Sequence, residues 1–348
     1  MCALAPVSPV LIERWFSTGV YPRIQHVLTP VSNVVPFALF DVMLVVTALV
    51  LILTLWRAVR TAWRERRWLP LGRAAMRIVT GAATVYLLFL TLWGWNYRRL
   101  PMLERLEVRD GGTTTEQVAA LGLLAVEHLN QLYGPAHATG WPSDVRSSEA
   151  LRHAFVDAQR LLSNAPEAEP GRLKQTLLGP YFRWTSVDGM VNPFALEVLA
   201  NPDLLPFERP FIAAHEWSHL AGYAHEAEAN FVGWLACVRA DPASRYSGWL
   251  YLYWQVAGEL DATNRQQVST RLADGPRADL NAIVDRIRRG QLPWLRTVST
   301  TAYDHYLRAN RVEEGIRAYG EVITLILRAR FDPGWTPVRR GRTPALSP

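Results

Sequence analysis

Two long apolar segments near the start of the chain restrict its fold more than any other feature. The first covers residues 34–56, VVPFALFDVMLVVTALVLILTLW, with Asp41 as its one charged side chain, and the second covers residues 78–95, IVTGAATVYLLFLTLWGW, with none. Each approaches the roughly 20 residues that an α-helix needs to cross the hydrocarbon core of a bilayer. Tryptophans stand at the ends of both segments, where aromatic belts form at membrane interfaces. We therefore predict two transmembrane helices, and two buried core helices are the alternative.

An arginine-rich loop between the two segments predicts their orientation. Residues 57–77, RAVRTAWRERRWLPLGRAAMR, contain seven Arg and one Glu. Short loops rich in Lys and Arg stay on the cytoplasmic side of a membrane. We therefore predict a two-pass cell-membrane protein with a cytoplasmic loop, whose termini and C-terminal domain lie outside the cytoplasm. Residues 1–33 are then an extracytoplasmic segment at the membrane interface, and membrane lipids are expected partners.

The positive charge of the chain is confined to the part that holds these segments. The formal net charge is +6, but residues 1–100 hold 11 Arg against three acidic residues, and residues 101–348 hold 26 basic and 28 acidic residues. A nucleic-acid-binding domain carries its basic surplus on the folded domain itself. The charge distribution therefore argues against a nucleic-acid partner. Cys2 and Cys237 are too far apart to indicate a disulfide framework.

The remainder of the chain has the pattern of one mostly helical domain. Residues 113–134, TTTEQVAALGLLAVEHLNQLYG, show cap-type Thr residues, helical apolar spacing and a closing Gly. Residues 181–199, YFRWTSVDGMVNPFALEVL, are rich in aromatic and β-branched residues and indicate short strands. We predict a mainly α fold: two transmembrane helices within residues 34–97, then a helical domain with a small sheet over residues 98–331. The Pro- and Arg-rich tail, residues 332–348, is predicted to be disordered.

The stretch FIAAHEWSHLAGYAHEAEANF, residues 211–231, contains an H-E-x-x-H motif. On a helix, His215 and His219 share a face, so both imidazoles reach one metal ion. Glu216 beside them is placed to act as the general base that takes a proton from water held by the metal. A pair of surface histidines is the alternative. Catalytic zinc sites use three protein ligands and keep one position open, so the motif needs a third ligand.

His225 and Glu226 compete for the place of third ligand. With His225, the stretch fits the metzincin pattern H-E-x-x-H-x-x-G-x-x-H, which also needs a downstream Met-turn, and no Met follows His225. In an unbroken helix Glu226 would lie about 10 Å along the axis from the second histidine, so Gly222 must end the first helix and let the next one fold back. We therefore favour a single Zn²⁺ ion held by His215, His219 and Glu226, with His225 as the less favoured ligand.

Other polar residues are candidates for roles around the metal. Asn230, one turn after Glu226, is placed to hold a ligand histidine by a hydrogen bond. A hydrolase of amide bonds needs a donor for the developing oxyanion, and candidates cluster late in the domain: Tyr303, His305, Arg317 and Tyr319. Asn192 and Glu197 lie in GMVNPFALE, a candidate edge strand that aligns a peptide substrate by backbone pairing. Ordinary surface, turn and core positions are the alternative for each.

The chain resembles the bacterial DUF3810 family of membrane proteins with an extracytoplasmic zincin-like domain. The resemblance covers nearly the whole chain and rests on IERWFSTGVYPRI, WGWNYRRLP, NPFALE, PFIAAHEWSHLAGYAHEAEANFVGWLAC and YDHYLRANRVEEGIRAYGEV. It implies a zincin-like fold for residues 98–331. In that family the position of His225 often holds another residue, whereas E-x-E-A-N-F is typical, which favours Glu226. The resemblance implies no particular substrate.

These observations together predict a membrane-anchored zinc-dependent hydrolase. The expected activity is that of a metallopeptidase that cleaves peptide or amide bonds in a peptide or protein substrate of the cell envelope. The alternative is a non-catalytic envelope protein with a structural or sensory zinc site. A structural site would be closed by four protein ligands, and the adjacent pair His225 and Glu226 keeps this alternative open.

Overall fold

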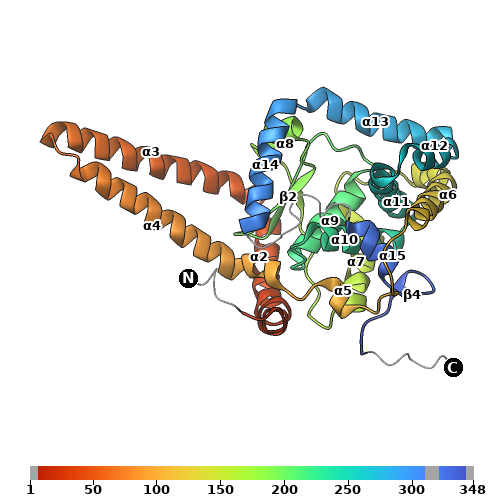
Figure 1. The fold of residues 1–348 in the computed structure, drawn as a ribbon. Helices are drawn as coiled ribbons and strands as arrows, with labels where there is room; N and C mark the ends of the chain where they lie inside the picture. Colours follow the sequence, from red (N-terminus) through yellow and green to blue (C-terminus); the bar gives the residue numbers. More distant parts are fainter. Residues whose placement is uncertain (1–6, 310–320, 342–348) are drawn as a thin grey trace.

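The computed structural model describes residues 7–309 and 321–341, and a helical hairpin projects from its mostly helical body (Figure 1). The hairpin consists of α3 (Leu39–Glu65) and α4 (Leu69–Leu92). Both helices are long and apolar enough to cross a membrane, and the apolar stretches are almost entirely exposed. The helices continue into residues 57–77, where the sequence predicted a loop, so that only residues 66–68 form the turn. Arg, Ala and Leu are good helix formers, which explains why helix persists beyond the apolar runs.

In its described residues, the body contains the other helices and five short strands. Before the hairpin lie α1 (Pro9–Leu11), η1 (Ile12–Val20) and α2 (Tyr21–Val34). After it lie η2 (Gly94–Arg98), α5 (Met102–Arg105), α6 (Thr115–Thr139), η3 (Val145–Ser147), α7 (Glu149–Leu162), α8 (Gly179–Thr185), α9 (Arg209–Leu220), α10 (Glu226–Val238), α11 (Pro242–Glu259), α12 (Ala262–Thr270), α13 (Asp274–Gly290), α14 (Pro293–Ala309) and α15 (Glu321–Arg328). The strands are β1 (Leu173–Lys174), β2 (Gly189–Asn192), β3 (Glu197–Ala200), β4 (Phe331–Asp332) and β5 (Thr336–Pro337). The predicted class, mainly helical with small sheets, is confirmed.

Helix α10 is the centre of the body. All its residues are buried, because its sequence EAEANFVGWLACV is apolar or small on every face apart from three polar side chains. It packs against α7, α9, α11 and α15. Large aromatic side chains fill this core, among them Trp217 of α9, Trp234 of α10 and Trp249 of α11, each at most 1% exposed. The position of α10 matters because its first residue is Glu226.

A three-stranded sheet covers one side of α9. The strand order is β1-β3-β2, with β3 parallel to β1 and antiparallel to β2. The register pairs Met190 with Leu199 and Asn192 with Glu197. Among the described residues β2 has a single strand neighbour, so it forms an edge of this sheet. Contacts from α9 reach both β2 and β3, which brings the histidine-bearing helix beside an edge strand.

The N-terminal segment, which the sequence predicted to lie at the membrane interface, packs on the body. Ile12, Phe16 and Tyr21 are buried in the main hydrophobic core. The Tyr21 hydroxyl donates a hydrogen bond to the Leu220 carbonyl at 2.7 Å, and the Thr29 hydroxyl donates one to the Leu196 carbonyl at 2.9 Å. One side of the segment is therefore buried against protein, whereas Trp15, Val27 and Val31 are exposed.

Residues 332–341 are also structured, which differs from the predicted disorder. Strands β4 and β5 form a small antiparallel sheet, and the Trp335 ring lies 5.0 Å from Trp234 and 5.7 Å from Trp249, centroid to centroid. Burial of one large aromatic ring in an aromatic cluster offsets the ordering of a Pro- and Arg-rich segment. The last residues of that tail, 342–348, lie outside the described residues.

Candidate metal centre

The H-E-x-x-H motif lies on α9, and a tight turn leads from it to α10. The Gly222 amide donates a hydrogen bond to the His219 carbonyl at 3.0 Å, and the Tyr223 amide donates one to the Ser218 carbonyl at 3.0 Å. Gly222 has a φ of +81°, in the left-handed region that a glycine adopts without steric cost. The chain reverses here, and α10 begins at Glu226.

This reversal brings His215, His219 and Glu226 together. The two Nε2 atoms of the histidines are 3.2 Å apart, and Glu226 Oε2 lies 3.4 Å from His215 Nε2 and 3.7 Å from His219 Nε2. Bonds of about 2.05 Å in tetrahedral geometry, as zinc forms with N and O ligands, give ligand–ligand separations of about 3.3 Å. The three atoms therefore form a triangle of the size that one zinc ion would need. Within the described part of the chain, no fourth His, Cys, Asp or Glu belongs to this group.

The orientation of His219 is fixed by backbone groups on both sides of the turn. Its Nδ1–H donates to the Tyr223 carbonyl at 2.8 Å, which leaves Nε2 directed at the cluster. The indole N–H of Trp93, the residue that follows α4, donates to the His219 carbonyl at 3.0 Å. Burial favours the neutral imidazole, but the Glu226 carboxylate outweighs it and raises the His219 pKa to about 9. The surroundings of His219 thus favour positive charge.

Glu226 is the negative counterpart at the same place. Burial raises the pKa of its carboxyl group, but the nearby His219 and His215 outweigh burial and hold this pKa well below the usual value. The Tyr303 hydroxyl, from α14, donates a hydrogen bond to Glu226 Oε1 at 2.7 Å. Tyr303 therefore holds one carboxylate oxygen while the other faces the histidines. Among the described residues, Tyr303 is the predicted oxyanion donor that contacts the cluster.

Glu216 is buried beside the cluster and faces the edge strand. A Cβ atom added at Gly189, the first residue of β2, would overlap the Glu216 carboxylate, so the absence of a side chain at 189 leaves room for it. Burial raises the pKa of this carboxyl group. Glu216 Oε2 has no hydrogen-bond partner among the described residues. A buried carboxylate oxygen without a partner is costly, and it is the oxygen expected to receive a hydrogen bond from a bound molecule.

A second glycine sets the distance between the two helices of the site. A Cβ added at Gly233 on α10 would lie 2.9 Å from the backbone nitrogen of His215 on α9. Glu226, Asn230 and Gly233 recur at helical spacing and share the face of α10 that is turned to α9. Asn230 is buried, but its Nδ2 and the Nδ1 of His215 have no hydrogen-bond partner in the described structure. The predicted hydrogen bond from Asn230 to a ligand histidine is not formed.

His225 and Glu228 point away from the cluster. His225 Nε2 lies 3.1 Å from the Tyr97 carbonyl and donates to it. Glu228 Oε1 accepts a hydrogen bond from the Met102 amide at 2.6 Å, and Oε2 lies 3.4 Å from a guanidinium nitrogen of Arg105. Both side chains tie the start of α10 to the segment that follows α4.

The other predicted residues are distributed as follows. His305 is exposed on α14, and Arg317 and Tyr319 lie outside the described residues. Glu197 lies on the central strand β3 and not on an edge. Both oxygens of its carboxylate accept hydrogen bonds from protein groups. It accepts hydrogen bonds from the amides of Leu39 and Phe40 at the start of α3, from Lys174 Nζ at 2.8 Å and from Asn192 Nδ2 at 3.0 Å. Glu197 and Asn192 therefore join the sheet to the hairpin.

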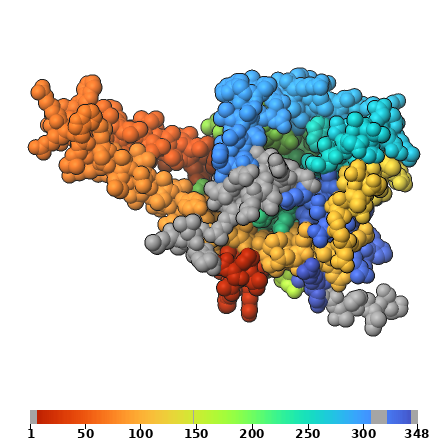
Figure 2. All heavy atoms as spheres, in the orientation of Figure 1, coloured from red at the N-terminus to blue at the C-terminus, as the bar shows by residue number. Residues whose placement is uncertain are grey.

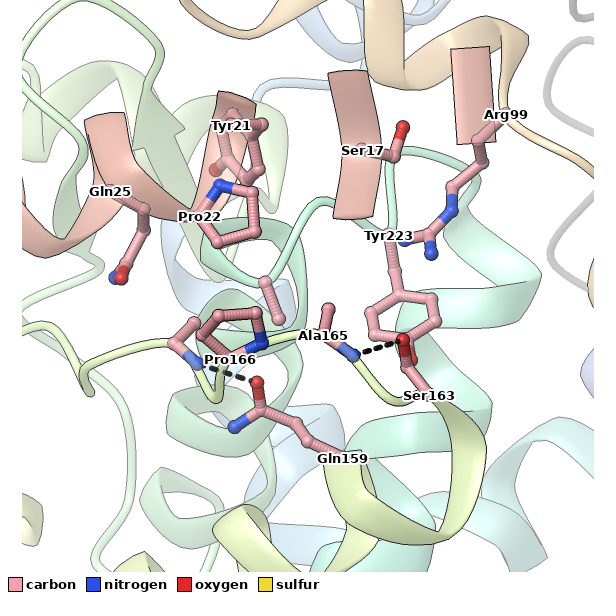
Figure 3. A pocket seen from close by; sticks show the side chains of 12 residues that line it. Ser17, Tyr21, Pro22, Gln25, Arg99, Gln159, Ser163, Ala165, Pro166 and Tyr223 are labelled. Carbon is pink, nitrogen blue, oxygen red and sulfur yellow. Dashed lines mark hydrogen bonds between the residues drawn. The ribbon is translucent and has the colours of Figure 1, made fainter. Parts of the chain in front are cut away.

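A small pocket behind the α9–α10 turn is lined by polar side chains, but none of the three clustered residues lines it (Figure 3). Figure 3 shows Ser17 and Tyr21 above it and Gln159 and Ser163 of the α7 region below it, with Tyr223 and Arg99 to one side. Arg99 is held by Glu13 through two hydrogen bonds of 3.0 and 2.9 Å and donates to the Gly222 carbonyl at 2.8 Å. The residues around this pocket therefore hold the α9–α10 turn in place.

Several residues of the site had no distinctive sequence signal. Tyr223 acts on His219 through a backbone carbonyl, which every residue has. Trp93 was assigned to a membrane interface, and its contact with α9 spans more than one hundred residues of sequence. Gly189 and Gly233 did carry a signal, since an isolated glycine inside a strand or helix pattern often marks a close approach of another group.

A family model described as a protein of unknown function, DUF3810, matches residues 16–327, which is most of the chain. The chain belongs to the DUF3810 family. The match includes the segment before the hairpin, the hairpin, the clustered residues and α14. The comparisons with curated proteins and with solved structures gave no match. The DUF3810 assignment thus supports the resemblance based on the sequence motifs, and the chemistry of the site has to be argued from its geometry.

Proposed function

We propose that this DUF3810 protein is a membrane-anchored zinc-dependent hydrolase that cleaves peptide or other amide bonds. The observation that carries the proposal is the triangle of His215, His219 and Glu226 with the buried, partnerless carboxylate oxygen of Glu216 beside it. Two imidazoles and one carboxylate are the ligand set of a catalytic zinc site with an open position. The side chain of His225 makes its contact elsewhere, which favours an open site over a closed structural one.

Each residue has a distinct role in this proposal. His215, His219 and Glu226 would hold the ion. Zinc, when bound, would supply a Lewis acid that makes a water molecule more acidic and polarises a carbonyl group. The Glu216 carboxylate would take the proton of the attacking water and later pass it to the leaving nitrogen. The Tyr303 hydroxyl would keep Glu226 oriented.

Strand β2 is the proposed site for the substrate backbone. It is an edge strand, and its first residue faces Glu216. An extended peptide pairs with a free strand edge through main-chain hydrogen bonds. A polypeptide paired with β2 would pass directly by the proposed general base. Asn192, at the other end of β2, would act through the sheet and the start of α3 and not by contact with the substrate.

The proposal places the site outside the cytoplasm. Helices α3 and α4 would cross the membrane, and the arginines around the turn of the hairpin would remain on the cytoplasmic side. The body, connected to the other ends of both helices, would then lie at the outer surface, with a peptide or protein of the cell envelope as substrate.

Replacement of Glu216 by Gln tests whether the site is catalytic. The full-length protein in detergent or nanodiscs would be assayed for bound zinc and for cleavage of a quenched-fluorescent peptide library. Glu216→Gln should retain zinc and lose turnover by about 10²–10⁴-fold, which is typical of general-base removal. Glu259→Gln, at an exposed glutamate of α11, is the matched control and should behave like the wild type. Unchanged turnover in Glu216→Gln, or a zinc-loaded wild type that cleaves no library member, would favour a structural or sensory zinc.

A further inference from the structure

Helix α14 has two different faces, and among the described residues only one of them packs on the body. The inner face carries Leu295, Ser299 and Tyr303 at intervals of four residues. The Tyr181 hydroxyl and the Ser299 hydroxyl are 2.6 Å apart, and the Tyr303 hydroxyl reaches Glu226. The outer face carries Trp294 and Val298, which are 66% and 59% exposed. A tryptophan and a valine so exposed on one face indicate a partner surface that is apolar.

Exposed basic side chains directly precede this apolar face. Arg288 and Arg289 at the end of α13 are exposed, and no Asp or Glu occurs between Arg286 and Tyr303. Leu292, between the two helices, is also partly exposed at 36%. Tryptophan with flanking arginines is typical of helices that lie in the interface of a bilayer, where the ring enters the boundary of headgroups and acyl chains and the cations meet anionic headgroups.

The position of α14 next to the hairpin is fixed by α8. The Leu292 amide donates a hydrogen bond to the Trp184 carbonyl at 2.9 Å, so α14 begins on the last turn of α8. The amide of Leu177, just before α8, donates to Asp41 Oδ2 in the first turn of α3 at 2.9 Å. Phe182 of α8 packs in a small core with Ala38, directly before α3. Helix α14 therefore belongs to the side of the body from which the hairpin projects.

The figures agree with these contacts. In Figure 1, α14 runs across the base of the hairpin, beside the first turn of α3 and roughly crosswise to α3 and α4. In Figure 2, the atoms of α14 form the margin of the body that faces the hairpin. A bilayer crossed by α3 and α4 would have its surface at this level.

We propose that the outer face of α14 docks on the surface of the same bilayer that the hairpin crosses. Leu292, Trp294 and Val298 would lie at the boundary of headgroups and acyl chains, and Arg288 and Arg289 would contact anionic lipid phosphates. The inference rests on the membrane-spanning role proposed for α3 and α4. If the inference holds, α14 contacts the lipid surface with one face. With another face it contacts the candidate metal ligand Glu226, through the Tyr303 hydroxyl.

Depth-dependent fluorescence quenching tests this inference in the full-length protein. Val298→Cys would carry a polarity-sensitive fluorophore in a Cys2→Ser background, in which Cys237 remains buried. The protein would be placed in nanodiscs with phosphatidylglycerol and headgroup-region spin-labelled lipid. We expect a blue-shifted emission and loss of most of its intensity at position 298. Gln266→Cys, an exposed position on the remote helix α12, is the matched control and should remain unquenched.

A third labelled position shows whether a negative result concerns the docking of α14 or the insertion of the hairpin in the membrane. Leu49→Cys lies in the middle of the apolar run of α3 and is expected to be quenched by a deep acyl-chain spin label. Quenching at 49 with none at 298 would overturn the docking of α14 and leave the membrane anchor intact. Quenching at neither position would overturn both. Replacement of Arg288 and Arg289 by Gln should reduce quenching at 298, and an unchanged value would overturn their role at anionic lipid.

Discussion

Two adjacent side chains at the start of α10, His225 and Glu226, make contacts in different places. His225 donates to the Tyr97 carbonyl, whereas Glu226 faces His215 and His219. We therefore expect Glu226→Ala to lose bound zinc and His225→Ala to retain most of it, because only the first removes a ligand. The measurement is the zinc content of each purified protein by mass spectrometry. A zinc-free His225→Ala protein together with a zinc-loaded Glu226→Ala protein would reverse the assignment.

At the scale of residues, the sequence was sufficient to predict the clustered residues of the candidate site but not the hydrogen bonds that hold them. The spacing of H-E-x-x-H, the break at Gly222 and the missing Met-turn were enough to predict which residues come together. The predicted hydrogen bond from Asn230 is not formed, and Tyr303 could not be distinguished from the polar residues near it. Contacts of this kind depend on how α14 crosses the start of α10, and local sequence patterns contain no information about that crossing.

At the scale of elements, the close approach of α9 and α10 depends on Gly233. An added Cβ would lie 2.9 Å from a backbone atom of α9, so Gly233→Ala must separate the helices. We expect a loss of about 1–3 kcal/mol in the free energy of unfolding, typical of an overpacked core, together with weaker zinc binding. Thermal unfolding and zinc titration would measure both effects. Gly258→Ala on α11 is the control, because a Cβ there meets no atom within 4 Å; equal behaviour of the two variants would contradict the prediction.

The contact of β3 with the first turn of α3 predicts a pH-dependent stability. Burial raises the pKa of the Glu197 carboxyl group, but hydrogen bonds from Lys174, Asn192 and the amides of α3 outweigh it and lower this pKa. A carboxyl group whose pKa is lowered by folding stabilises the protein above its unfolded pKa, near 4.5, and this contribution disappears as the pH falls through the folded value.

Glu197→Gln should therefore lower the unfolding temperature strongly at pH 7, because it leaves the buried Lys174 without its counter-charge. Loss of one partner of a buried ion pair costs about 3–5 kcal/mol. The difference from the wild type should shrink as the pH falls below 4.5 and through the lowered pKa of the folded wild-type carboxyl group. Glu104→Gln, at an exposed position, should show no such difference. A pH-independent gap for Glu197→Gln would contradict the ionic explanation.

At the scale of the whole molecule, the expected topology is the most direct prediction. Reporter fusions at residue 67, in the turn of the hairpin, should be active only as cytoplasmic reporters. Fusions after residue 341 should be active only as extracytoplasmic reporters, because the arginines around the turn hold it inside. A reporter at the C-terminal position that functions only in the cytoplasm would contradict both the topology and an envelope substrate.

The sequence predicted the general class of the molecule but not how its distant parts associate. Apolar runs and helical periodicity were sufficient for a hairpin and a helical body with small sheets. The packing of α2 against α9, and of Trp335 against Trp234, joins residues far apart in the chain. Such contacts are decided by shape and burial in three dimensions, and an amphipathic segment has the same pattern whether it meets lipid or protein.

The packing of the N-terminal helices on the body has a consequence for release of the protein from its membrane. The segment before the hairpin and the body after it are bonded to each other, for example through Arg99 and Glu13 and through Tyr21 and Leu220. If the hairpin crosses the bilayer as proposed, one proteolytic cut in its turn would leave both halves associated and still embedded. Shedding would need cuts at both ends of the hairpin. If the substrates of the proposed hydrolase are membrane-bound as well, it would meet them by lateral diffusion, and its rate would follow their density in the membrane plane.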